Sequence, residues 1–269
     1  MPKNASAKQS PEPEFSLSVS RALRILSSFR HECPAQGLAE ISRSMKLSKG
    51  SAARFLRALE MHGYVDRDPQ SRLYRPGPEI ARVGSLYNGA GWIKQVALPT
   101  MQSLVQRFGF TSYLSALRGK CMVILSAVEG IGPIKYSIPV GTKLPVHSTA
   151  TGQAALAHLD TKAVDAIVTR NGLPPDTPHT ITNRVTLAKR LAQVRAQGYS
   201  INWEERTLGV ASVAAPVINR NGVPLCILSL GFATSQIKRE RISKLGVEVR
   251  ATANRLAAEL DAKGISNVD

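Results

Sequence analysis

Five basic side chains lie close together in the first quarter of the 269-residue chain, with no acidic residue among them. They are Arg43, Lys46, Lys49, Arg54 and Arg57. Guanidinium and ammonium groups donate hydrogen bonds to phosphate oxygens and to base edges, so such a cluster predicts contact with a nucleic acid. The competing interpretation is a solvated helix face, because basic runs are common on exposed helices. The elements around the cluster have to decide between the two.

The whole chain carries 35 Lys and Arg against 19 Asp and Glu, a formal net charge of +16 that favours a polyanionic partner. A division near residue 90 leaves +6 before it and +10 after it, so bulk charge does not locate the partner's site. The composition, 43% hydrophobic and 20% charged, is that of a globular protein. No apolar run reaches the roughly 18 residues of a membrane helix. The polar N-terminus lacks the apolar core of a secretion signal, so we expect a cytoplasmic protein with no membrane partner.

Apolar spacing on either side of the cluster predicts three short helices, and residues 64–75 predict two short strands around a polar turn. Ser48 is a good N-cap for the third helix and Gly63 a plausible C-cap, while Lys46 and Leu47 form a tight connection before it. The expected buried side chains, helix by helix, are Val19, Ala22, Leu23, Leu26 and Phe29; Leu38, Ile41 and Met45; and Ala52, Phe55, Leu56 and Leu59. This order of elements is typical of a winged helix-turn-helix, which we expect over residues 15–76.

The winged helix-turn-helix layout favours the DNA-binding interpretation of the basic cluster. A recognition helix turns its apolar face inward and presents its first polar residues to base edges in the major groove. Arginines of the hairpin suit phosphate or minor-groove contacts. The predicted DNA-binding residues are Arg43, Lys46, Ser48, Lys49, Ser51, Arg54, Arg57, Arg67, Arg72 and Arg75. The structural alternative for Arg54 is an ion pair with Glu40 or Glu60 that braces the motif.

The rest of the chain predicts a second, α+β domain. Residues 1–14 are expected to form a disordered tail, residues 77–91 a linker helix with a hinge near 88–91, and residues 92–262 the second domain. An amphipathic helix from Ile93 to Phe108 contains Pro99, which should kink it or mark a break. Hairpins bordered by helices indicate a sheet domain without regular β-α-β alternation. The expected strands are 111–117, 122–128, 134–138, 210–218 and 223–230, and the expected helices are 150–159, 163–169, 187–197 and 240–260.

Catalytic and metal-binding patterns are absent from the sequence. The five histidines and three cysteines show no ligand spacing, and neither a nucleophile elbow nor a phosphate-binding loop occurs. We therefore expect structural roles for the histidines, no metal, no cofactor and no enzymatic activity. The alternatives are a metabolic enzyme with an appended DNA-binding module and a non-specific, nucleoid-type DNA binder. Residues 141–156 place small polar side chains before a helix, whose first N–H groups can bind an anion, although spacing alone favours an ordinary Ser/Thr cap.

Three stretches, at 56–65, 141–156 and 198–217, together resemble the IclR family of bacterial transcriptional regulators. The resemblance covers nearly all of residues 17–260. It implies an N-terminal winged helix joined by a linker helix to a GAF-like domain that binds a small organic-acid effector. It also implies a homodimer or homotetramer on a palindromic, double-stranded DNA operator. Effector binding is then expected to change the spacing or order of the two winged helices through the linker.

The same resemblance assigns an effector pocket. The effector carboxylate is expected to meet the backbone N–H groups of Ala150 and Thr151. Asn202 stands where family members often have an acidic residue, and Gly231 leaves extra space. These two departures predict a larger or more anionic ligand, for example an aromatic carboxylate. The predicted effector-binding residues are Ile134, Leu144, Thr149, Ala150, Thr151, Asn202, Val210, Ser212, Ser229 and Gly231.

Overall fold

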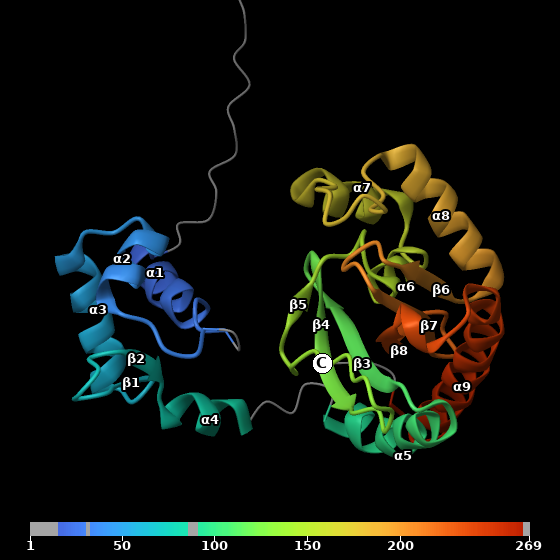
Figure 1. Ribbon diagram of the computed structural model, residues 1–269, viewed down its shortest axis with the longest axis horizontal. Coiled ribbons are helices and arrows are strands. Elements are labelled where there is room, and N and C mark those ends of the chain that lie inside the picture. Colours follow the sequence, from blue (N-terminus) through green and yellow to red (C-terminus); the bar gives the residue numbers. More distant parts are fainter. Residues whose placement is uncertain (1–15, 31–32, 86–90, 266–269) are drawn as a thin grey trace, which may run out of the picture. The chain divides into compact units, whose positions relative to one another are not determined.

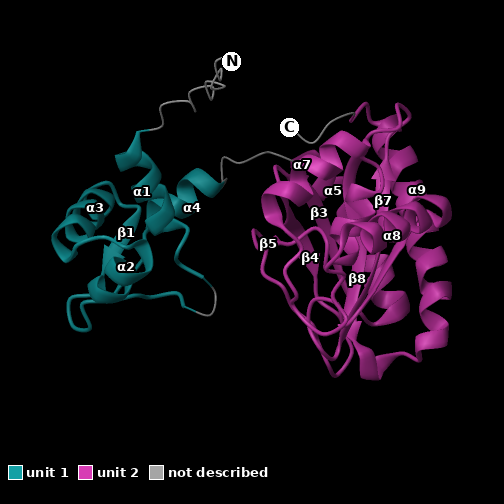
Figure 2. Ribbon diagram, turned by 90° about the horizontal axis from the view of Figure 1, so that it is seen from above, with its two compact units in different colours: residues 1–87 teal, residues 88–269 magenta. Residues whose placement is uncertain are grey.

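The computed structural model describes residues 16–30, 33–85 and 91–265, and its contacts divide the chain into two compact units, 1–87 and 88–269 (Figure 2). The expected tail at 1–14 and residues 88–90 of the expected hinge lie outside the described residues. Within the described ranges, no helix has both the length and the apolar character that crossing a membrane requires.

The first unit contains three helices followed by a hairpin and a fourth helix, as the spacing predicted (Figure 1). The hairpin strands are antiparallel, with Asp66 opposite Arg75. The core of the first unit is small and combines Ile25, Ile41, Leu56, Val65 and Tyr74 from five different elements. The bounds are α1 Leu17–Leu26, α2 Leu38–Met45, α3 Lys49–Met61, β1 Val65–Arg67, β2 Tyr74–Pro76 and α4 Pro78–Ser85.

The capping signals around α3 are confirmed. Lys46 ends α2 in the left-handed region at φ 55°, which makes the connection to α3 tight. Ser48 is the N-cap of α3, because its hydroxyl accepts from the backbone N of Ser51 at 3.2 Å. Gly63 follows the helix with φ 73°, a conformation that glycine adopts without strain.

The expected buried face of α1 is partly wrong, although Leu26 and Phe29 pack against the core as expected. Val19 and Leu23 are 58% and 57% exposed, whereas Ile25, which was not expected inside, is completely buried. The helix carries two overlapping apolar stripes, and packing against α2 and α3 selects the one that contains Ile25. A helix of ten residues contacts its neighbours through one narrow stripe, so apolar periodicity alone could not choose between them.

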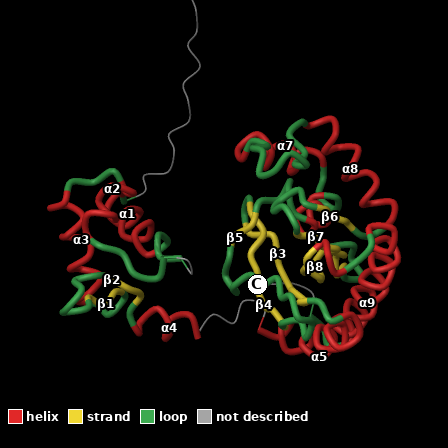
Figure 3. Tube along the Cα trace, in the orientation of Figure 1, coloured by secondary structure: helices red, strands yellow, loops and turns green. Residues whose placement is uncertain are grey.

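The second unit is a six-stranded antiparallel sheet with the strand order β5-β4-β3-β8-β7-β6 and helices on both faces (Figures 1 and 3). One core joins α5 and α9 to one face of the sheet, and a second core joins α6, α7 and α8 to the other. The strands are β3 Thr111–Arg118, β4 Cys121–Val128, β5 Lys143–Leu144, β6 Ser200–Trp203, β7 Val210–Ile218 and β8 Pro224–Ala233. The helices are α5 Gly91–Phe108, α6 Ala150–Leu156, α7 Thr161–Asn171, α8 Arg184–Gln197 and α9 Ile242–Ala262, with the short 3-10 turns η1 Thr234–Gln236 and η2 Arg239–Arg241 before α9.

Two sequence predictions for this unit need correction. Residues 134–138 form no strand; Ile138 N donates to the hydroxyl of Tyr113 at 3.0 Å, so a side chain replaces the strand partner. Of the two possibilities given for Pro99, the break does not occur, because α5 continues through it as one helix. The strands β5 and β6 were not predicted, because two and four residues are too short to show an apolar period.

Gly152 allows the chain before α6 to lie directly against the first turn of that helix. A Cβ at position 152 would be 2.3 Å from both the Cα and the carbonyl oxygen of Val146. The backbone N of Gly152 also donates to the hydroxyl of Thr149 at 3.1 Å, which caps α6. This close approach fixes residues 145–149 at the helix start.

Replacement of Gly152 by alanine should therefore destabilise the protein, because the clash is with backbone and cannot be relieved by a rotamer change. We expect a loss of about 3 kcal/mol in the free energy of unfolding. The matched control is Gly50→Ala in α3, where a Cβ meets nothing within 4 Å and a gain of roughly 0.5–1 kcal/mol is expected. Calorimetric unfolding checks both; equal stability of the two variants would contradict the packing at Val146.

Candidate functional site

The basic side chains predicted to bind DNA are all exposed. They extend from the end of α2 through the connection and along α3 to the hairpin; they are Arg43, Lys46, Lys49, Arg54, Arg57, Arg67, Arg72 and Arg75. The two serines predicted to bind DNA also have a structural role at the start of α3. The hydroxyl of Ser48 donates to the hydroxyl of Ser51 at 3.0 Å.

Arg54 makes no ion pair with Glu40 or Glu60 in the part of the chain that the structure describes. Glu40 instead caps the start of α2, where its carboxylate accepts from Gly37 N at 2.9 Å. The first unit has one described ion pair, Arg82 with Glu79, on α4 and away from α3. The structural alternative for Arg54 is therefore not realised, and its guanidinium faces solvent.

The turn of the hairpin is fixed by Asp68. One of its carboxylate oxygens accepts from Ser71 N at 2.7 Å and from Gln70 N at 3.1 Å, and the bonds from Ser71 hold the pKa of Asp68 below its usual range. Arg72 lies in this turn with φ 58°, and the guanidinium of Arg67 lies 5.5 Å from the ring centre of Tyr74. The tight turn therefore presents its arginines on a rigid wing.

The second unit contains a cavity of about 40 Å³ beside the start of α6. Eight predicted effector-binding residues line it: Leu144, Thr149, Thr151, Asn202, Val210, Ser212, Ser229 and Gly231. The other two do not line it, because Ile134 is 51% exposed on its loop and the side chain of Ala150 is buried in the core of α6. Sequence reasoning missed six further lining residues: Tyr113, Ile124, Tyr136, Ile138, Arg206 and Thr207.

Gly231 leaves no extra space, contrary to expectation. A Cβ built on it would lie 3.1 Å from the ring of Tyr113 and 3.1 Å from the ring of Tyr136, so the two phenol rings occupy that volume. Tyr113 is opposite Ser229 in the β3–β8 register, so the strand pairing could have indicated it. Tyr136 lies on an irregular loop, whose position beside the cavity no pattern of residues indicates.

The two tyrosines are neutral hydrogen-bonding groups. The hydroxyl of Tyr113 donates to the carbonyl oxygen of Tyr136 at 2.5 Å. Burial raises the pKa of Tyr113 and that of Tyr136, because a phenolate loses hydration in the interior. A hydrogen bond with Thr207 and the charge of Arg206 act in the opposite direction on Tyr136, but burial dominates. The cavity wall therefore offers phenol groups and no phenolate.

The first turn of α6 supplies backbone donors. The hydroxyl of Thr149 donates to Pro145 O at 2.6 Å and accepts from Gly152 N, which leaves the N–H groups of Ala150 and Thr151 without a partner inside the helix. Asn202 on the opposite wall uses its amide internally: it donates to Ser148 O at 2.8 Å and accepts from Glu205 N at 3.3 Å. Asn202 therefore holds two loops together as well as lining the cavity.

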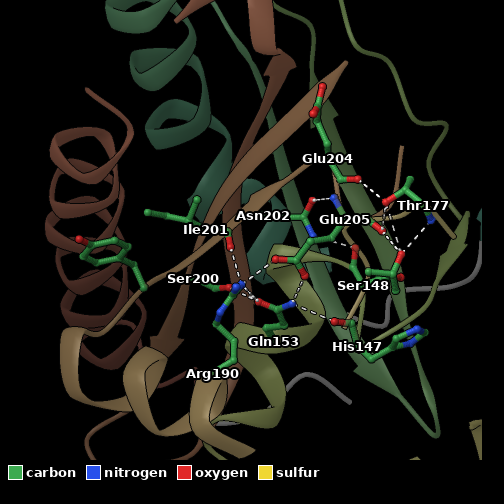
Figure 4. A network of polar contacts seen from close by, with 12 residues as sticks. His147, Ser148, Gln153, Thr177, Arg190, Ser200, Ile201, Asn202, Glu204 and Glu205 are labelled. Carbon is green, nitrogen blue, oxygen red and sulfur yellow. Dashed lines mark hydrogen bonds and ion pairs between the residues drawn. The ribbon is translucent and has the colours of Figure 1, made fainter. Parts of the chain in front are cut away.

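A buried polar network lies next to the cavity (Figure 4). Glu205 is 5% exposed, and its two carboxylate oxygens accept from Arg190 Nη1 and Gln153 Nε2, each at 2.7 Å. The side-chain oxygen of Gln153 accepts from the hydroxyl of Ser200 at 3.0 Å. These contacts connect α6, α8 and β6 through charged and amide groups.

Two histidines are hydrogen-bonded to backbone carbonyls, His147 to Pro174 at 2.9 Å and His158 to Ala154 at 3.0 Å, which is consistent with structural roles. Among the described residues, no group of three or more His, Cys, Asp or Glu side chains could hold a metal ion.

Comparison with known proteins gives matches along both units. The family model for the IclR helix-turn-helix domain matches residues 18–69, and that for the C-terminal domain of the bacterial transcriptional regulator IclR matches residues 90–258. The chain is 34% identical over 238 residues to the HTH-type transcriptional regulator XynR of Escherichia coli K12, which covers 86% of this chain and 94% of the relative. It is 26% identical over 245 residues to the HTH-type transcriptional repressor AllR of the same strain, a match that covers 91% of this chain and 90% of the relative.

Solved structures agree with this assignment. An IclR transcriptional regulator from Alicyclobacillus acidocaldarius is 29% identical, with a TM-score of 0.77 over 91% of this chain and 98% of that one. An IclR homologue from Microbacterium hydrocarbonoxydans, solved in complex with 4-hydroxybenzoate, has the same fold at 23% identity and a TM-score of 0.77. The match covers 91% of this chain and 99% of that one. The chain therefore belongs to the IclR family, as a transcriptional regulator with an N-terminal DNA-binding helix-turn-helix and a C-terminal effector domain.

Proposed function

We propose that this regulator binds a palindromic operator as a homodimer or homotetramer and that a small organic acid in the cavity beside α6 changes its operator affinity. The observation that carries this proposal is the pairing of two features in one chain: an exposed basic surface on α3 and the hairpin, and an effector-domain cavity bordered by the free N–H groups of α6. The first suits a polyanion and the second a carboxylate.

The DNA-binding half of the proposal assigns different contacts to α3 and to the hairpin. Lys49 and Arg54, near the start of α3, are placed to reach base edges, whereas Arg72 and Arg75 on the wing suit phosphates. Support comes from the exposure of these side chains and from the absence of an ion pair between Arg54 and either acidic candidate in the described chain.

The size of the cavity favours a small acid over the aromatic one that we first expected. A volume of about 40 Å³ is well below the roughly 150 Å³ of a protein cavity that holds benzene. An aromatic acid would fit only after Tyr113 or Tyr136 had moved. We therefore propose an acid of a few carbon atoms, with its carboxylate at Ala150 N and Thr151 N and its apolar part against Ile124 or Leu144.

The regulatory step follows from linkage. An acid that binds one quaternary arrangement more tightly than another shifts the population toward it, and the two arrangements present the winged helices at different spacings. The competing function is an enzyme that turns the acid over. Relatives with this layout are named regulators and repressors, which favours regulation.

Arg54→Ala should weaken operator binding by about tenfold or more, because a base-edge contact by arginine contributes roughly 1–3 kcal/mol. The matched control is Arg24→Ala, which removes the same charge from an exposed position on α1, outside the predicted surface. The measurement is a gel-shift titration at several salt concentrations on an operator selected from genomic fragments. Equal losses in the two variants would mean that only overall charge matters, and a flat salt dependence would exclude phosphate contacts.

Ser229→Ala should weaken binding of the acid about fivefold or more, because it removes a cavity hydroxyl that can donate to the ligand. The control is Ser112→Ala on the neighbouring strand β3, a buried serine whose side chain points to the opposite face of the sheet from the adjacent Tyr113. The hydroxyl of Ser112 has no hydrogen-bond partner among the described residues, so its removal breaks no hydrogen bond.

The measurement for both serine variants is thermal stabilisation and calorimetric titration with glyoxylate, pyruvate, propionate and 4-hydroxybenzoate. We expect stabilisation by one of the three small acids in the wild type and in Ser112→Ala, and a weaker effect in Ser229→Ala. Stabilisation by 4-hydroxybenzoate alone would contradict the proposed size limit. Conversion of the bound acid into a product would favour the enzyme.

A further inference from the structure

A second hollow, of about 460 Å³, follows the outer side of β6. Because β6 is the last strand of the sheet, one of its edges has no neighbouring strand, and the hollow lies there between α8 and the start of α9. We call it the β6 groove; the residues used below are Arg190, Ile201, Trp203, Glu204, Glu205 and Arg239, all of which line it. The sequence reasoning and the family resemblance assigned it no role.

The acidic groups of the β6 groove are hydrogen-bonded within the protein. Both carboxylate oxygens of Glu205 accept hydrogen bonds, from Arg190 and from Gln153. One carboxylate oxygen of Glu204 accepts from Gly209 N at 2.8 Å, and the other lies 3.8 Å from His179 Nε2. The charge of Arg190 therefore offsets that of Glu205, and the carboxylate of Glu204 is held by the backbone of Gly209.

The basic groups are less occupied. Arg190 makes its contacts to Gln153, Ile201 O and Glu205 through Nη1 alone, which leaves Nη2 and Nε as donors toward the groove. The guanidinium of Arg239 lies 5.5 Å from the ring centre of Trp203 and has no acidic residue within 4 Å in the described part of the chain. Its neighbours Lys238, Arg241 and Lys244 are exposed and add to the positive potential there, and the exposed Glu240 offsets one of these charges.

Part of the groove lining is apolar. Ile201 and Trp203 are half-buried against the core between the sheet and α9, and Ile242 at the start of α9 is 5% exposed, whereas the other lining residues are polar or charged. Apolar side chains beside guanidinium donors suit a ligand with both characters, because each part then replaces water with a matching surface.

We propose that the β6 groove is a second ligand site, distinct from the cavity beside α6, and that it binds an organic carboxylate with a flat apolar body. The carboxylate accepts from Arg239 and from the outer edge of Arg190, and the apolar body covers Ile201 and Trp203. Arg190 is bound to Glu205, whose backbone N donates to Asn202 in the wall of the first cavity. A ligand in the groove therefore acts on the same network that shapes that wall.

Tryptophan fluorescence gives a direct test. The chain has two tryptophans, and Trp92 lies on α5, 72% exposed and away from the groove. In a Trp92→Phe background Trp203 is the only reporter. Titration with benzoate should change its emission saturably, while benzyl alcohol, which has the ring without the carboxylate, should not saturate. Inorganic phosphate, an oxyanion without an apolar body, should bind at least tenfold more weakly than benzoate.

The decisive comparison is between two arginines of the same turn. Arg239→Gln should weaken benzoate binding about tenfold, because it removes a charge-assisted hydrogen bond. Arg241→Gln removes the same charge from an exposed side chain that does not line the groove, and should change affinity less than twofold. Equal effects of the two variants, or no saturation by benzoate, would overturn the proposal.

Binding in the groove must also be distinguished from binding in the first cavity. Ser229→Ala in the same Trp92→Phe background should leave the Trp203 titration unchanged, and loss of the signal would place the benzoate in the cavity instead. If no acid binds in the cavity but benzoate still gives the Arg239-dependent signal, the cavity proposal is wrong and the proposal for the β6 groove is kept.

Discussion

The buried carboxylate of Glu205 is the constraint on which the ligand-binding half of the molecule depends. A carboxylate removed from water is costly unless it is paired and hydrogen-bonded, and Glu205 satisfies both conditions through Arg190 and Gln153. These partners come from α8 and α6, and Glu205 itself follows β6. The requirement to satisfy one charge thus fixes three elements relative to one another. Residues of α6 and β6 line the cavity, and residues of α8 and β6 line the β6 groove.

The winged helix could be predicted from local signals, because each of its elements contains its own. Ser48 caps α3 with its own side chain, and Asp68 closes the hairpin turn through residues two and three positions away. The buried face of α1 could not be predicted in the same way. Its sequence offers two apolar stripes, and the choice of Ile25 over Leu23 is made by contacts with helices that are distant in sequence.

The cavity shows how far a binding site can be predicted from the sequence. Strand positions such as Ser212 and Ser229 were placed by family resemblance, and they line the cavity. The volume around Gly231 was misjudged because it depends on two rings from elsewhere in the chain, one on β3 and one on a loop. The Glu205 network was not predicted either. Gln153 and Glu205 lie in two of the stretches that carry the family resemblance, but they are 52 residues apart and no local pattern pairs them.

The net charge of +16 has different physical roles in the two units. In the second unit, part of the positive charge is spent on internal pairs: Arg190 with Glu205, Arg206 with Asp176 and Arg107 with Glu248. Four of its other basic residues, Lys238, Arg239, Arg241 and Lys244, lie near the start of α9, beside the apolar side chains of the β6 groove. In the first unit the basic side chains of α3 are exposed, without ion pairs among the described residues. A phosphate backbone, extended and hydrated, needs only exposed charge, whereas a small carboxylate gains from apolar contact as well. The surroundings of each basic group, more than their total, therefore distinguish a surface suited to DNA from one suited to a small anion.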